Sequence, residues 1–105
     1  MKRIYHKLIR DRIPEIIENQ GQCCIVKQLS DEEYLKMVDA KLDEELAEYH
    51  KKQNLEELAD LMEVIYAAAE ARGFTREQLE RVRAEKEAQR GAFHKRLLLL
   101  EVRDS

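Results

Sequence analysis

The feature that most constrains this fold is a pair of helical patterns separated by a short polar break. Ser30 and Glu33 match a capping box, which satisfies free backbone N–H groups at a helix start. Asn54 and Gly73 mark the two ends of the second pattern. Apolar residues recur at spacings of three and four in both patterns: Leu35, Val38, Leu42, Leu46 and Tyr49, then Leu58, Leu61, Met62, Ile65 and Ala69. We expect an antiparallel helical hairpin from residues 31–52 and 55–72.

Two further helices are expected beside this hairpin. Asp11 as an N-cap and Pro14 in a first turn predict a short helix that stops near Gly21. Thr75 and Gln78 match a second capping box, so a charged helix should begin there. Its apolar face is sparse, which predicts a helix that is well solvated or directed at a charged partner.

Three other segments have β character. Residues 4–9 fit a short strand or an extended lead-in, and residues 23–29 fit a short strand. Residues 97–102 fit either a strand that pairs with 23–29 or a docked helix. The expected fold class is mainly α, a helical bundle built on an antiparallel helix hairpin, with room for a minor short β pairing and completed by dimerisation.

Length and composition narrow the class of protein. The chain has 105 residues, which suits a single helical domain over residues 1–105. Hydrophobic residues make up 44% and charged residues 39%, which is too apolar for a disordered chain, and the richness in Glu, Lys, Arg, Leu and Ala favours helices. A net charge of −3 argues against a general binder of nucleic acid polymers. Cys23 and Cys24 are expected to be reduced thiols of a cytoplasmic protein, and no apolar run approaches the roughly 20 residues that span a membrane.

Two short acidic motifs, EELAE at 44–48 and ELAD at 57–60, lie on the two helices of the hairpin. In an antiparallel pair, facing residues have a nearly constant index sum, and 45 with 60 shares its sum with 48 and 57. Each motif contributes two carboxylates at i, i+3, which lie on one helix face. The register therefore predicts that Glu45, Glu48, Glu57 and Asp60 converge near the loop end of the hairpin.

Two interpretations of this convergence remain open from the residues alone. In one, the acids form solvated helix faces balanced by Lys41, Lys51 and Lys52, and Glu57 is only the capping partner of Asn54. In the other, the acids bind Mg²⁺ or Mn²⁺, which prefer carboxylate and water oxygens and accept substrate phosphates. A di-iron bundle needs Glu-x-x-His pairs, and none of the three histidines lies three residues after a Glu. Three isolated glycines exclude a Gly-rich phosphate loop.

The acidic motifs and their flanking segments resemble a known signature. EELAE followed by ELAD is similar to the E-E-x-x-E and E-x-x-D motifs of the all-α nucleotide pyrophosphohydrolases. This superfamily includes MazG-like enzymes, dimeric dUTPases and phosphoribosyl-ATP pyrophosphohydrolase. HKLIRDRIPEII near the N-terminus and EKEAQRGAFHKRL near the C-terminus resemble a small MazG-like branch described as phosphoribosyl-ATP pyrophosphohydrolase-like. The resemblance covers nearly the whole chain.

This resemblance implies a Mg²⁺-dependent hydrolase that cleaves a nucleoside triphosphate between the α and β phosphates and sanitises the nucleotide pool. It implies that Glu45, Glu48, Glu57 and Asp60 hold the metal, with Glu44 as a helper that orients a ligand or water. Glu45 or Glu48 would accept the proton of the attacking water. The triphosphate also needs cations, for which the candidates are Lys86, Arg90, Lys95, Arg96, Arg10 and Arg12.

Other classes of function remain open. The chain could be a non-catalytic helical subunit that binds nucleotide or metal for regulation, or a structural bundle whose acidic faces confer solubility. A homodimer or higher homo-oligomer is expected in each case, because a hairpin with one charged helix leaves apolar surface uncovered. A neighbouring copy could then contribute basic residues to the site.

Overall fold

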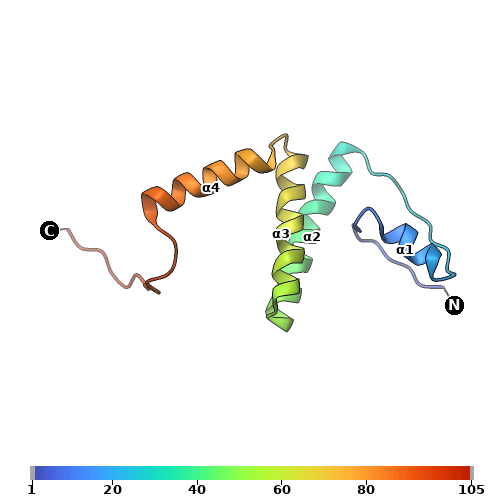
Figure 1. Ribbon diagram of the computed structural model, residues 1–105, viewed down its shortest axis with the longest axis horizontal. Helices are drawn as coiled ribbons and strands as arrows, with labels where there is room; N and C mark the ends of the chain where they lie inside the picture. Colours follow the sequence, from blue (N-terminus) through green and yellow to red (C-terminus); the bar gives the residue numbers. More distant parts are fainter. Residues whose placement is uncertain (1, 105) are drawn as a thin grey trace.

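The computed structural model describes residues 2–104, which form four helices and no strand (Figure 1). These are α1 (Ile13–Asn19), α2 (Asp31–Lys52), α3 (Leu55–Ala71) and α4 (Arg76–Arg90). α2 and α3 lie side by side as an antiparallel hairpin, and α1 and α4 project on opposite sides of it. The predicted mainly α class is confirmed. The predicted domain over residues 1–105 extends beyond the described range by Met1 and Ser105.

Local capping interactions set the ends of α2 and the start of α3. The Ser30 hydroxyl accepts a hydrogen bond from the Glu33 N–H, and the Glu33 carboxylate accepts one from the Ser30 N–H, both at 3.2 Å. Gln53 ends α2 in the left-handed conformation with φ 52°. Asn54 follows directly, and its side-chain oxygen accepts a hydrogen bond from the Glu57 N–H at 3.0 Å. Because two residues connect the helices, the chain must reverse at once.

Glycine and a second capping box form the turn between α3 and α4. Gly73 has φ 87°, and the N–H groups of Gly73 and Phe74 donate to carbonyls in the last turn of α3, at 3.0 and 2.9 Å. This pattern is the Schellman motif, which favours glycine at the left-handed position. Thr75 and Gln78 then exchange hydrogen bonds of 2.8 and 3.1 Å. α4 therefore begins where the sequence predicts, and it leads away from the hairpin (Figure 1).

The α1 cap and the short β pairing depart from prediction. Arg12, rather than Asp11, precedes α1, and no side chain caps this helix. Residues 23–29 and 97–102 have no regular secondary structure, so the predicted pairing and the docked terminal helix are both wrong for this chain. A strand needs a partner ladder for stability. Figure 1 places residues 23–29 between α1 and α2 and residues 97–102 beyond α4, at opposite ends of the molecule.

The hairpin covers only part of its own apolar stripes. Val38 is fully buried, whereas Leu46, Leu58 and Met62 are 43%, 43% and 47% exposed. The accessible surface area is 10,079 Å². A compact protein of this mass would expose about 6,200 Å². The radius of gyration is 18.6 Å, against about 13 Å for a compact chain of this length. Within residues 2–104, none of the helices combines the length and apolarity that a membrane span requires.

We predict that the start of α2 is sensitive to acid through Glu33. Hydrogen bonds from the Lys27 ammonium, at 2.9 Å, and from Ser30 lower the pKa of the Glu33 carboxyl from 4.5 to about 2. Because the pKa is lower in the folded state, this stabilisation is present above about pH 4.5 and is lost as the pH falls through about 2. Glu33→Gln should melt below the wild type at neutral pH and together with it near pH 2. Circular dichroism melts would measure this difference, and a gap that does not change with pH would contradict the assignment.

Candidate metal centre

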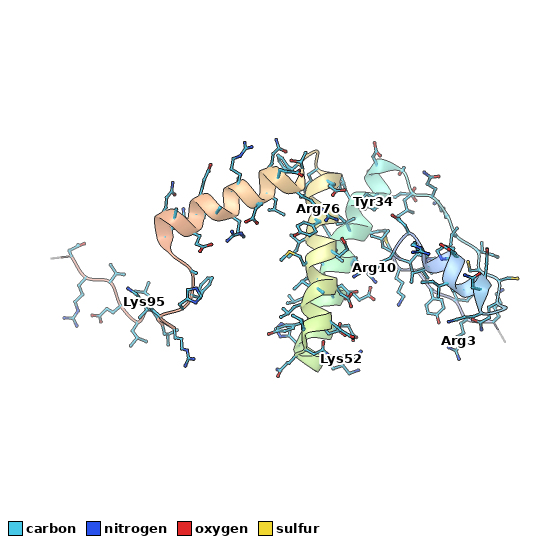
Figure 2. The ribbon with its side chains drawn as sticks, in the orientation of Figure 1. Arg3, Arg10, Tyr34, Lys52, Arg76 and Lys95 are labelled. Carbon is cyan, nitrogen blue, oxygen red and sulfur yellow. The ribbon has the colours of Figure 1, made fainter. Side chains whose placement is uncertain are left out.

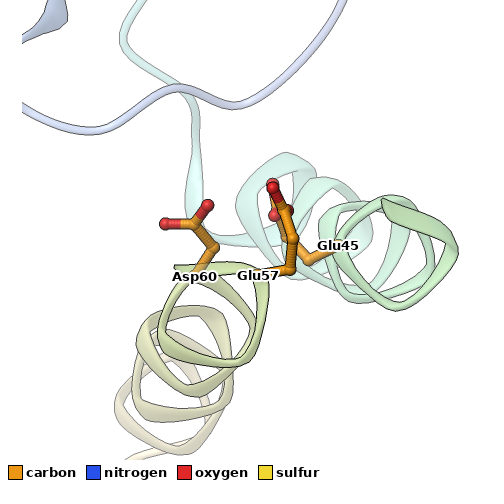
Figure 3. Close-up of side chains that lie close together, drawn as sticks. All are labelled: Glu45, Glu57 and Asp60. Carbon is orange, nitrogen blue, oxygen red and sulfur yellow. The ribbon is translucent and has the colours of Figure 1, made fainter. Parts of the chain in front are cut away.

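Three carboxylates from the two acidic motifs meet across the hairpin (Figure 3). Glu45 projects from α2, Glu57 and Asp60 project from α3, and one oxygen of each lies within 4.8 Å of the other two. Glu57 is 7% exposed. The side chains of Glu45 and Asp60 are 12% and 42% exposed. The cluster therefore has a sheltered side formed by the glutamates and an open side at the aspartate.

The start of α3 places Glu57 in this cluster. Asn54 holds the Glu57 backbone N–H, so the Glu57 side chain lies near the positive end of the helix dipole. Rather than closing a capping box, its carboxylate lies 3.7 Å from the Lys52 ammonium, which is beyond hydrogen-bond distance. Within residues 2–104, no group donates a hydrogen bond to the Glu57 carboxylate. Among the described residues, no fully buried side-chain oxygen lacks a hydrogen-bond partner, so solvent still reaches the oxygens of this carboxylate that accept none.

Two lysines of α2 oppose the charge of the glutamates. The Lys41 ammonium lies 3.4 Å from Glu45. The Lys52 ammonium lies 3.5 Å from Glu48 and so bridges it to Glu57 on the other helix. Coulombic attraction to the carboxylates of Glu57 and Glu48, together with hydrogen bonding to Glu48, raises the pKa of Lys52. Lys52 therefore keeps its positive charge between the two helices at neutral pH.

The segment that precedes α1 adds two more cations. This segment, residues 2–12, crosses the open side of the cluster (Figure 3). The Arg10 guanidinium donates a hydrogen bond to the Asp60 carboxylate at 2.7 Å, across 50 residues of sequence. Lys7 Nζ lies 3.9 Å from Glu44. Figure 2 shows Arg10 beside the hairpin and Lys52 at its loop end.

The other predicted site residues do not join the group of three. Glu48 lies outside it and connects to it through Lys52. Arg12 pairs with Glu15 at 3.1 Å, at the start of α1. Four predicted phosphate ligands lie on or after α4, which leads away from the acids (Figure 1, Figure 2): Lys86, Arg90, Lys95 and Arg96. In this arrangement these four residues do not face the acids of their own chain.

The sequence carried a partial signal for the bridging lysine. Glu48 and Lys52 have the i, i+4 spacing that predicts an ion pair along one helix. The second contact of Lys52, with Glu57, depends on the two-residue loop and on how the helices pack. Spacing alone therefore predicts the contact of Lys52 with Glu48 but not its contact with Glu57.

The donor set suits a hard divalent cation. Carboxylate oxygens are the ligands that Mg²⁺ prefers, and they also suit Mn²⁺. One oxygen of each of Glu45, Glu57 and Asp60 lies within 4.8 Å of the other two, so a single cation could contact all three after they move closer together. Three carboxylates leave positions for water and for phosphate oxygens, and a bound cation would satisfy the weakly bonded Glu57.

Comparison with known proteins shows a likeness over part of the chain. A stretch of 42 residues is 55% identical to a protein of Mycolicibacterium smegmatis (strain ATCC 700084 / mc(2)155) that is described as an uncharacterized protein. The match covers 40% of this chain and 43% of that protein, so it spans less than half the length of the relative. No family model and no solved structure matches the chain. The similarity to this relative therefore indicates no activity for the chain.

We predict that Mg²⁺ or Mn²⁺ stabilises the fold through this cluster. A ligand that binds only the folded state adds about 2.7 kcal/mol of stability at 100 times its Kd. For a domain of this size, that corresponds to a rise in Tm of roughly 10–20 °C. Glu45→Gln and Asp60→Asn should each lose most of this rise in differential scanning fluorimetry.

Glu56→Gln is the matched control for this experiment. It removes the same charge from an exposed position next to Glu57, outside the group of three. This variant should keep the rise in Tm that the metal causes. An equal rise in all variants would show that the metal binds elsewhere.

Proposed function

We propose that this protein is a Mg²⁺-dependent nucleoside triphosphate pyrophosphohydrolase of the MazG-like all-α superfamily, in its phosphoribosyl-ATP pyrophosphohydrolase-like branch. The observation that carries the proposal is the meeting of Glu45, Glu57 and Asp60 across the hairpin. These residues come from both acidic motifs, and the resemblance to the family rests on the same motifs. The role we propose is the removal of unwanted nucleotides in the cytoplasm.

The acids would have two roles: some would hold the metal, and one would accept a proton from water. Glu45, Glu57 and Asp60 would hold Mg²⁺, which when bound neutralises phosphate oxygens and lowers the pKa of a water molecule. Glu48 is the better general base, because it lies one turn from Glu45 and outside the group of three. Glu45 is the other candidate for this proton. Glu44, beside Lys41 at 3.2 Å, is placed to help orient water.

The reaction is a hydrolysis of one phosphoanhydride bond. The oxygen of water forms a bond to the α or the β phosphorus while the bond from that phosphorus to the bridging oxygen breaks, and the bridging oxygen leaves with the electron pair on the other product. The water's proton passes to Glu48, and the products are a nucleoside monophosphate and pyrophosphate. Positioning and charge stabilisation carry most of such a reaction, because the protein forms no covalent intermediate.

We propose that a second copy of the chain supplies the missing phosphate ligands. A standard interface buries about 1,600 Å² in total. The accessible surface of 10,079 Å² exceeds that of a compact chain by more than this amount. Exposed apolar side chains on the hairpin, such as Leu58 and Met62, would pack in a homodimer. In such a pair, α4 of one copy and the residues that follow it can bring four cations to the acids of the other: Lys86, Arg90, Lys95 and Arg96.

We predict that the full-length protein with Mg²⁺ releases pyrophosphate from at least one member of a panel of ribo- and deoxyribonucleoside triphosphates. Glu45→Ala and Asp60→Ala should each lower kcat/KM by about 100-fold or more, the scale expected when a charge-stabilising group is lost. A coupled pyrophosphate assay would measure this, with Glu56→Gln as the variant that keeps its activity. If both alanine variants kept full activity, the site assignment would be wrong.

The same panel separates the other classes of function. Nucleotide binding without pyrophosphate release from any member would favour a regulatory subunit. Absence of both nucleotide binding and metal stabilisation would favour a structural bundle. Each of these results would replace the proposed activity.

We predict that light scattering gives at least twice the 12.5 kDa mass of one chain. The shared site is tested by mixing two inactive variants, Glu45→Ala and the double variant Lys86→Gln with Arg90→Gln. A mixed dimer would contain one site with both defects and one intact site. Random exchange of copies should therefore restore about a quarter of the wild-type rate. No recovery from a mixture shown to exchange would mean that each site is built from one chain.

A further inference from the structure

We propose that Arg10 exchanges partners during metal loading: it holds Asp60 while the site lacks a metal, and it binds a phosphate of the substrate once the metal has taken Asp60. This inference rests on the proposed function. It adds a regulatory role for the segment before α1, which the acidic motifs do not include. Arg10 would thus neutralise Asp60 before the metal binds and contact the substrate phosphate afterwards.

The contact with Asp60, and not the geometry of a helix, determines where the Arg10 guanidinium lies. Lys41 and Lys52 lie on α2, four residues from Glu45 and Glu48 respectively, so helix geometry keeps them near these two acids. Arg10 comes from a segment without regular secondary structure, yet its guanidinium reaches Asp60 at 2.7 Å. This is the shortest contact between a cation and an acid of the cluster.

The segment before α1 spans both helices of the hairpin. Arg10 contacts Asp60 on α3, and Lys7 of the same segment contacts Glu44 on α2 at 3.9 Å. The Arg10 carbonyl accepts a hydrogen bond from the Ile13 N–H at 3.1 Å, which fixes the backbone of Arg10 at the start of α1. The guanidinium can therefore turn while its backbone stays beside the site.

The Arg10–Asp60 pair is suited to displacement. The two side chains are 57% and 42% exposed, and an exposed ion pair is individually weak. A divalent ion coordinated by Asp60 brings two positive charges next to the guanidinium and repels it. The planar fork of arginine matches a phosphate oxygen pair as well as a carboxylate. A phosphate bound to the same metal would then be the nearest anion for Arg10.

The test measures metal affinity and substrate affinity separately on the full chain. Binding of Mn²⁺ without nucleotide is followed by isothermal titration calorimetry, and KM and kcat are measured with saturating Mg²⁺. In Arg10→Gln, the Kd for Mn²⁺ should fall by about two- to fivefold, which is what loss of an exposed ion pair allows. The KM for the nucleotide should rise by roughly tenfold or more, because a charged hydrogen bond to phosphate is lost.

Arg3→Gln is the matched control, because it removes the same charge from the same segment. Arg3 lies below α1 and away from the hairpin, whereas Arg10 lies beside the hairpin (Figure 2). This control should leave the Kd for Mn²⁺ and the KM within about twofold of the wild type, because a distant exposed charge is screened. Circular dichroism would verify that both variants keep their helices.

Two results would overturn the exchange. If Arg10 only anchors the segment, Arg10→Gln would bind Mn²⁺ with unchanged or weaker affinity. If the effect is one of net charge, Arg3→Gln would tighten Mn²⁺ binding equally. In both cases the wild type would still bind Mn²⁺ and release pyrophosphate, so the proposed function would stand. A wild type that neither binds Mn²⁺ nor hydrolyses any nucleotide would refute the proposed function and the exchange together.

Discussion

The packing of α2 against α3 is the interaction on which the rest of this structure depends, and it brings like charges together. The apolar stripes of α2 and α3 require the helices to pack with one register, and that register brings Glu45, Glu57 and Asp60 together. Cations offset part of the repulsion: Lys41 and Lys52 from α2, and Arg10 from the segment before α1. Glu57 is buried for most of its surface, and the Lys52 ammonium lies 3.7 Å from its carboxylate. The three acids together could hold a cation, which would offset the remaining repulsion.

The parts of the fold that the sequence predicts well are those fixed by neighbours along the chain. Ser30 with Glu33 and Thr75 with Gln78 each satisfy backbone groups three residues away, so their helices begin where predicted. Asp11 fails as a cap because Arg12 takes the position before α1, and no side chain caps that helix. The β pairing fails because it depends on two distant segments meeting, and helices of fixed direction keep those segments apart.

In the candidate site, too, the sequence predicts some contacts and misses others. The convergence of α2 with α3 is predictable, because an antiparallel hairpin with a short loop has one register. The contact between Arg10 and Asp60 is not, since 50 residues separate them and no periodic pattern connects the segment to the hairpin. The fourth predicted ligand, Glu48, illustrates the limit of index sums. The sum places it opposite Glu57, but its carboxylate meets Lys52 instead of the other acids.

The length of the turn at Gln53 and Asn54 determines whether the acids of α3 face Glu45 of α2. The two residues connect the helices with no slack, since Gln53 ends one and Asn54 caps the next. One residue inserted into or deleted from the first turn of α3 would rotate the helix by about 100° about its axis relative to its cap. Glu57 and Asp60 would then leave the face they share with Glu45, although no acid had been lost. Between related chains, a gap at this turn would therefore mark a change of site as surely as the substitution of a ligand.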